Sequence, residues 1–162
     1  MIRLATSSDA AEINKIYNQA VVAKCTAHTT ALPVEYTTDW LNQHDPEKYP
    51  VFVYQADQTL SGWLSLSPYR EGRKALEQTA EISFYVDNKW QRKGMGRSLI
   101  THAMAASRQL QISTLIAFIL GTNSASTSLL NRFGFDVWGR LPGIAKFDDY
   151  YCDHIIMGKT LA

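Results

Sequence analysis

Residues 91–97, which read QRKGMGR, place two glycines and three cations between a strand-like run and a helix-like run. The strand-like run is Thr79–Val86, and the helix-like run covers 97–109. A turn of this kind can offer several backbone N–H groups to a phosphate, and the positive end of the helix dipole points to the same place. The glycines leave room for close backbone approach, and the cations add positive charge. The segment therefore predicts a site for a ligand that carries a pyrophosphate.

A tight turn with a solvated basic cluster is the alternative interpretation of these residues, because a short glycine motif has low specificity. Two familiar phosphate motifs are excluded. The spacing is not the GxGxxG of a dinucleotide fold, since Arg97, Ser98 and Leu99 follow Gly96. It is not a P-loop either, because no Gly-Lys-Ser/Thr follows at the required spacing.

Size and composition favour one globular domain over residues 1–162. Hydrophobic residues make up 46% of the chain and charged residues 19%. The net charge of +1 produces no global field for nucleic acid or an anionic membrane, and no apolar run approaches the roughly 20 residues of a membrane span. Cys25 and Cys152 have neither metal nor redox spacing, so a reduced cytoplasm is the expected location.

Hydrophobic periodicity predicts a mixed sheet with helices on both faces. Apolar residues recur at helical spacing over 13–21, and two β-rich runs joined by three residues predict a hairpin. The apolar run Thr114–Leu120 is typical of a strand buried on both faces. The expected order is strand 2–5, helices over 13–21 and 36–43, strands 51–56, 60–67 and 79–86, helix 97–109, strand 114–120, a short helix from 124 to about 133, and strands at 137–138 and 155–157.

Further motifs follow one another in the second half of the chain. They read TAEISFYV at 79–86, QxxGxG at 91–96, GxNxxS at 121–126, FGF at 133–135 and WGRLPGIA at 138–145. This series resembles the GNAT superfamily of N-acetyltransferases, and within it the phosphinothricin and methionine-sulfoximine acetyltransferase branch. The resemblance covers nearly the whole chain and is strongest from about Thr79 to Leu161.

The resemblance implies an α/β (α+β) fold with a central, mixed, mostly antiparallel sheet that splays between its fourth and fifth strands. It also implies acetyl-CoA as co-substrate, with the pyrophosphate on the turn after the fourth strand and the pantetheine arm alongside that strand. Asn123 would hydrogen-bond the pantetheine or acetyl end, although a helix N-cap is the alternative role. The residues expected to bind the cofactor are Phe84, Tyr85, Val86, Gln91, Arg92, Lys93, Gly94, Met95, Gly96, Arg97, Asn123, Ser126 and Arg132.

Transfer of an acetyl group to an amine needs a proton acceptor, because an amino acid's amine is largely protonated at neutral pH. Glu81 is the candidate base: the related glutamate is the proposed base in similar acetyltransferases. It lies about 10–16 Å along the strand from Tyr85 and Val86, which favours proton removal through water. A structural pairing of Glu81 with Arg73 is the alternative. Leu130 stands where many family members carry a tyrosine acid, so the source of any proton for the leaving thiolate is open.

Arginine suits the carboxylate of an amino-acid acceptor, because its planar fork matches that group. Arg73 and Lys74, in the polar loop 68–78, are the expected acceptor-binding residues, with Tyr150 as a wall of the pocket. Solvated loop charge is the alternative for the cations. In similar proteins the segment near Tyr150 can come from a second subunit, so we expect a homodimer. The four histidines share no metal spacing, and we assign them no role and expect no metal.

The leading hypothesis is an N-acetyltransferase that acts on a small amino acid or analogue of the phosphinothricin or methionine sulfoximine/sulfone type, with no nucleic-acid or membrane partner. Two alternatives remain: an enzyme that acetylates a protein N-terminus or lysine, and a non-catalytic module that binds acetyl-CoA. The physiological acceptor, the kinetic order and the oligomeric state are not encoded in any motif of the chain.

Overall fold

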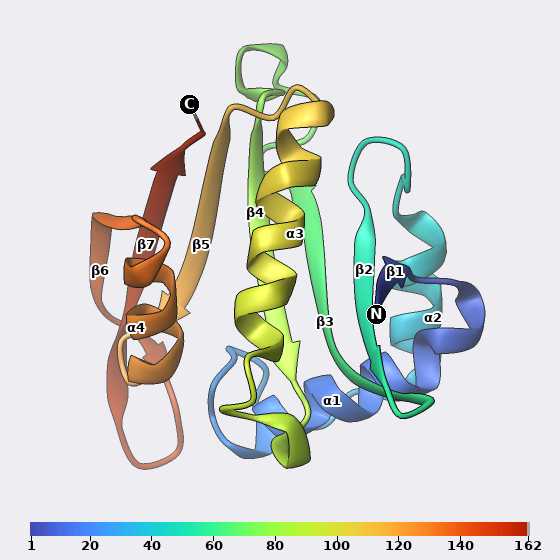
Figure 1. Ribbon diagram of the computed structural model, residues 1–162. Helices are drawn as coiled ribbons and strands as arrows, with labels where there is room; N and C mark the ends of the chain where they lie inside the picture. The colour runs from blue at the N-terminus through green and yellow to red at the C-terminus, as the bar shows by residue number, and fades with distance from the viewer. Residues whose placement is uncertain (162) are drawn as a thin grey trace.

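The computed structural model describes residues 1–161, which form one seven-stranded sheet with helices on both faces (Figure 1). The strands are β1 (Ile2–Leu4), β2 (Val51–Ala56), β3 (Thr59–Pro68), β4 (Thr79–Val86), β5 (Thr114–Leu120), β6 (Asp136–Lys146) and β7 (Tyr151–Thr160). The helices are α1 (Ala10–Val22), α2 (Val34–Gln43), α3 (Met95–Gln109) and α4 (Ser124–Arg132), with short 3-10 turns at Ser7–Asp9, Lys74–Leu76 and Asn88–Trp90. The predicted order of elements is confirmed.

The strands lie in the order β1-β2-β3-β4-β5-β7-β6. All neighbouring pairs are antiparallel except β4 and β5, which run parallel. The expectation of a mixed, mostly antiparallel sheet is therefore confirmed. None of the helices within residues 1–161 has the length and hydrophobicity that a membrane crossing requires.

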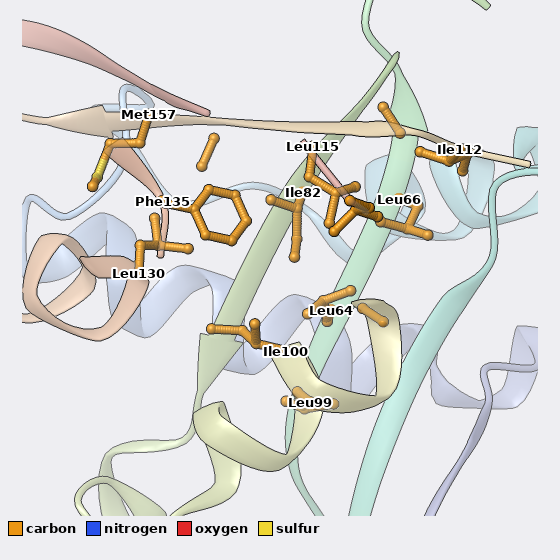
Figure 2. Packing of buried hydrophobic residues seen from close by; sticks show 14 of the residues in the cluster. Leu64, Leu66, Ile82, Leu99, Ile100, Ile112, Leu115, Leu130, Phe135 and Met157 are labelled. Atoms are coloured by element: carbon orange, nitrogen blue, oxygen red, sulfur yellow. The ribbon is translucent and has the colours of Figure 1, made fainter. Parts of the chain in front are cut away.

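The main core lies between the sheet and α3 with α4 (Figure 2). Leu99 and Ile100 of α3 are fully buried against Leu64 and Ile82 of the sheet, because the helix turns its apolar face inward. A second cluster on the opposite face joins α1 to β2 and β3. Each face of the sheet thus has its own layer of helices.

Strand β4 separates these two layers. Ala80 and Ile82 are buried in the main core, whereas Glu81, Ser83 and Tyr85 face the side covered by α1 and α2. The alternation expected over this strand is confirmed, and it directs Glu81 away from the core that α3 and α4 fill.

Most differences from the predicted boundaries are small, but the last two strands are much longer than the short closing strands expected. Strand β6 is an edge strand whose residues are mostly exposed, and its pairing with β7 shifts register between Leu141 and Ala145. Gly143 has a φ of +62° within that interruption. The bulge and the two-sided exposure remove the alternating apolar pattern by which a strand is recognised.

Candidate active site

A gap opens in the middle of the sheet between β4 and β5. The parallel pairing covers Thr79 to Glu81 on β4 and ends at the pair Glu81 and Ile116. Beyond that pair the two strands diverge toward the end of the sheet where α3 begins (Figure 1). The predicted splay between the fourth and fifth strands is confirmed.

The edge of β4 that faces this gap carries backbone groups free to bind a ligand. The amide of Asp87 donates to the carbonyl of Ser61 at 2.9 Å, so the odd-numbered residues of β4 direct their backbone groups toward β3. The amides and carbonyls of Phe84 and Val86 therefore point to the other edge, past the last pair with β5. A flat, extended ligand could pair with them as an added strand does.

The glycine turn adjoins the open end of the gap. Gly94 has a φ of +86° and is the N-cap of α3, and the first α-helical hydrogen bond runs from the amide of Ser98 to its carbonyl. The amides of the first helical turn precede that bond and are available to an anion. A Cβ on Gly94 would meet no atom within 4 Å, so the turn has open space beside it.

Gly96 is required by close packing rather than by its backbone conformation. A Cβ at this position would lie 3.0 Å from Leu129 Cδ2 of α4 and 3.8 Å from Val86 Cγ2 of β4. The absence of a side chain lets α3 begin close to both elements. The turn, the gap and the start of α4 are in this way brought together.

The cations of the turn are placed around it rather than buried in it. Arg92 and Arg97 are exposed, and Arg92 adopts a left-handed φ of +60°. The Lys93 ammonium lies 4.8 Å from the centre of the Trp90 ring. Gln91 donates to Asn88 at 3.0 Å. The three cations provide an exposed positive rim that suits a phosphorylated ligand.

Helix α4 begins beside β5, directly after the strand. Asn123 is its N-cap, and the side-chain carbonyl accepts from the Ser126 amide at 3.2 Å. The Asn123 NH2 group is not used by this cap, so capping and ligand binding are compatible. Arg132, also expected near the cofactor, lies exposed in the last turn of α4, about 13 Å along the helix from Asn123.

A cavity of about 550 Å³ lies on the α1 and α2 side of the gap. Aromatic side chains form part of its walls, and the described residues that line it include no lysine or arginine. The aromatic side chains are Tyr17, Tyr36, Trp40, Trp63, Tyr85 and Phe118, and the polar groups include Thr26, His28, Ser65, Ser67, Glu81, Ser83 and His154. The volume, and the combination of apolar walls with polar groups, are typical of a small-molecule site.

Glu81 is the only acidic side chain among the residues that line this first cavity. It is half-buried, and burial raises the pKa of its carboxyl above the ordinary value, while the Ser83 hydroxyl, 3.5 Å away, opposes that shift. No ion pair joins Glu81 to Arg73 among the described residues. A carboxylate with a raised pKa in a cavity is a chemically reasonable proton acceptor.

Other titratable groups line the same cavity as Glu81. The Tyr17 hydroxyl contacts Thr26 at 2.8 Å and His28 Nδ1 at 2.5 Å. Burial raises the pKa of Tyr85 well above its ordinary value, so the phenol stays protonated. Leu130 is fully buried in the main core, which leaves the position of the family's usual tyrosine without a proton to donate.

Arg73 and Lys74 line a second cavity of about 790 Å³, not the first. The two cavities have Trp40 and Ser67 in common, so the loop cations lie next to the first cavity rather than in it. Tyr150 is not among the residues that line either cavity. Its ring stacks on Phe147 at 5.1 Å.

Sequence reasoning missed most walls of the first cavity. Tyr17 continues the apolar stripe of α1, so its spacing alone predicts a core position. Trp40 and Trp63 carried no motif, and His154 was assigned no role. The alternation of β4 was the available signal, since it places Ser83 and Tyr85 on the face of Glu81.

The splayed sheet, the glycine turn at a helix N-terminus and the carboxylate-bearing cavity thus lie next to one another in one part of the molecule. The chain belongs to the acetyltransferase (GNAT) domain family, whose model matches residues 2–156. By family it is an acyltransferase.

Individual proteins agree with this assignment. The chain is 34% identical over 163 residues to a Bacillus subtilis protein provisionally named phosphinothricin acetyltransferase, with 99% of each chain covered. It is 31% identical to a Salmonella typhimurium L-methionine sulfoximine/L-methionine sulfone acetyltransferase, over 88% of this chain and 84% of that protein. The solved structure of Salmonella typhimurium yncA, provisionally described as an acetyltransferase with its cofactor acetyl-CoA, superposes with a TM-score of 0.93 at 27% identity, covering 100% of this chain and 94% of that chain.

Proposed function

We propose that this chain transfers the acetyl group of acetyl-CoA to the amino group of a small amino acid, with Glu81 as a base that acts through water. The observation that carries the proposal is the position of the Glu81 cavity, which lies beside the open edge of β4. A reactive group held at that edge would meet an amine held in the cavity.

The residues at the gap fit acetyl-CoA. Backbone groups of Phe84 and Val86 would pair with the amides of the pantetheine arm, and the turn around Gly94 would hold the pyrophosphate. Acetyl-CoA supplies an activated thioester carbonyl. The protein's own contribution is to position the amine, to exclude bulk water with the aromatic walls and to accept its proton.

The walls of the first cavity favour an acceptor whose side chain is neutral. Phosphinothricin carries an anionic phosphinate, and the described residues that line this cavity include no lysine or arginine to pair with it. The sulfone and sulfoximine groups of methionine analogues are neutral acceptors of hydrogen bonds, which Ser65, Ser67 and Thr26 could donate. The acceptor carboxylate would reach Arg73 in the adjoining second cavity. Methionine sulfone and sulfoximine are therefore the proposed acceptor type.

The test is a thiol-release assay with acetyl-CoA and matched acceptors. We expect kcat/KM for L-methionine sulfone to exceed that for L-phosphinothricin by about 100-fold, the effect of one uncompensated buried charge. A preference for phosphinothricin would contradict the assigned acceptor type. Activity on peptides alone would identify a protein acetyltransferase instead. Tight acetyl-CoA binding without any transfer would identify a non-catalytic module.

A homodimer is proposed as the working assembly. The support is β6, an edge strand with large exposed apolar side chains, including Val137 (58% exposed) and Ile144 (60% exposed). Such an edge is commonly covered in solution. Light scattering coupled to size-exclusion chromatography would show twice the chain mass, and Ile144→Lys would give the monomer. A monomeric wild-type protein would contradict the assembly.

A further inference from the structure

Two titratable side chains face the first cavity at the open end of the gap. Tyr85 lies four residues beyond Glu81 on β4, and Leu120 lies four residues beyond Ile116 on β5. His154 on β7 is the direct cross-strand partner of Leu120, and it lines the same cavity. Paired residues of this kind have Cβ atoms about 5 Å apart. Tyr85 and Leu120 therefore border the gap where it has opened, and His154 lies one strand behind Leu120 on the same wall of the cavity.

Glu81 is at the other end of the cavity, where the two strands are still paired. Four residues of β-strand span about 13 Å, so Glu81 and His154 are separated by roughly that length along the sheet. An ammonium acceptor loses two protons during acetyl transfer: one before its nitrogen attacks, and one after the new bond forms. The position of Glu81 suits the first of these, which can travel through water.

His154 is free to act at the open end. Among residues 1–161, no hydrogen bond is made to its imidazole, and its nearest ring neighbour is Phe118 at 5.6 Å. The adjacent carboxylate of Asp153 is engaged elsewhere, by Arg140 Nε at 2.9 Å and the Gly143 amide at 2.8 Å. Burial lowers the pKa of His154, so the ring is neutral at neutral pH and can accept a proton.

Resting on the proposed function, we propose that His154 is a second catalytic residue, which carries the amine's second proton to the leaving sulfur. The amine nitrogen forms a bond to the thioester carbonyl carbon and passes one proton to an imidazole nitrogen of His154. The carbon–sulfur bond breaks with its electron pair on sulfur, and the imidazolium returns that proton to the thiolate. The products are the amide and the free thiol, and the histidine ends neutral.

Tyr85 and the residue at the family's usual acid position, Leu130, are poorer proton carriers. Leu130 has no ionisable group. Tyr85 retains its proton because burial raises its pKa, and its hydroxyl interacts with Thr26. A shuttle must both accept and donate near neutral pH, which an imidazole does and a phenol of high pKa does not.

The kinetic test compares His154→Ala and His154→Gln with the wild-type protein, using acetyl-CoA and L-methionine sulfone. Both variants should lose about 100-fold in kcat, and free imidazole should restore part of the activity of His154→Ala only. His102→Ala is the matched control, because His102 of α3 packs against Phe52 of β2 and lines neither cavity. Thermal unfolding of each variant identifies any that fails to fold, in which case His154→Gln replaces His154→Ala.

A second readout does not depend on turnover. In NMR titrations of the unliganded protein, the His154 ring should be neutral at pH 7, and added CoA should shift its resonances while those of His102 stay in place. If the wild-type protein transfers the acetyl group to no amine, both the proposed function and this role of His154 are wrong. Two results would overturn the role of His154 alone, provided that the wild-type protein transfers normally. One is a kcat of His154→Gln within about threefold of the wild-type value, and the other is a His154 ring whose resonances do not respond to CoA.

Discussion

Ser67 of β3 and Glu81 of β4 lie directly opposite each other in the sheet. Ser67 lines both cavities, whereas Glu81 lines only the first. The pair therefore marks the boundary between the compartment with a carboxylate and the compartment with loop cations. One small acceptor could place its amine on one side of this boundary and its acid on the other.

Glu81→Gln should lower kcat/KM for L-methionine sulfone by about 100-fold and leave acetyl-CoA affinity unchanged, because the amide cannot accept the proton. Burial raises the pKa of Glu81, so the base becomes protonated at a higher pH than an ordinary glutamate does. As the pH is lowered, the wild-type rate should therefore begin to fall at a higher pH than it would with an ordinary glutamate. The pH–rate profile of the wild type, with calorimetry of acetyl-CoA binding to both proteins, checks this. Unchanged turnover in Glu81→Gln would remove the assignment.

The same substitution makes a prediction about stability. Folding raises the pKa of the Glu81 carboxyl, so the protein loses stability as the pH increases through the folded-state pKa of this group. Glu81→Gln should therefore be no less stable than the wild type at pH 7, even though it is less active. Urea denaturation measures this difference, and a large loss of stability would indicate a structural role for the carboxylate.

Arg73→Ala should raise KM for methionine sulfone by about tenfold, because one charge-assisted contact to the acceptor carboxylate is lost. Arg73→Lys should recover only part of the loss, since an ammonium lacks the planar fork. Lys15→Ala on α1 serves as the charge-matched control, because Lys15 is exposed, pairs with exposed Glu12 and lines neither cavity. Equal KM values for all four proteins would assign Arg73 to solvated surface.

Gly96 and Leu129 should be energetically coupled. In the wild-type background, the Cβ of Gly96→Ala would lie 3.0 Å from Leu129 Cδ2 and displace it. With Leu129→Ala in place, only the higher helix propensity of alanine remains. A double-mutant cycle of unfolding free energies should give a coupling of about 1 kcal/mol in favour of the double variant. Additive effects would mean that α4 adjusts without cost.

Asp9→Asn should destabilise the fold by about 2 kcal/mol at pH 7, because Arg3 donates to both carboxylate oxygens at 2.8 Å. Those hydrogen bonds lower the pKa of Asp9, and burial opposes the shift. The stability from the carboxylate is present above the unfolded-state pKa and is lost as the pH falls through the folded-state value.

The difference between wild type and Asp9→Asn should accordingly disappear in acid. Chemical denaturation across the acid range measures it, with the exposed Asp39→Asn on α2 as control. A difference in stability that persists at the lowest pH would show that the effect does not come from ionisation of Asp9.

Local patterns were sufficient for most elements. Strands Thr79–Val86 and Thr114–Leu120 match the predicted ranges, and α3 begins two residues before the predicted start at 97. Each has a clear period or a glycine boundary within a few residues of chain. Strand β6 has no such period, because exposure on both sides removes the alternation on which prediction depends.

The glycine turn, the alternation that separates Glu81 from Ile82 and the family motifs are all properties of contiguous residues, and the chain order alone reveals them. The cavity is different, because its walls come from α1, α2, β3, β4, β5 and β7. An aromatic residue such as Trp40 has the same local pattern whether it fills a core or faces a ligand. Only packing between distant segments decides which, and it alone brings His154 to the open end of the gap.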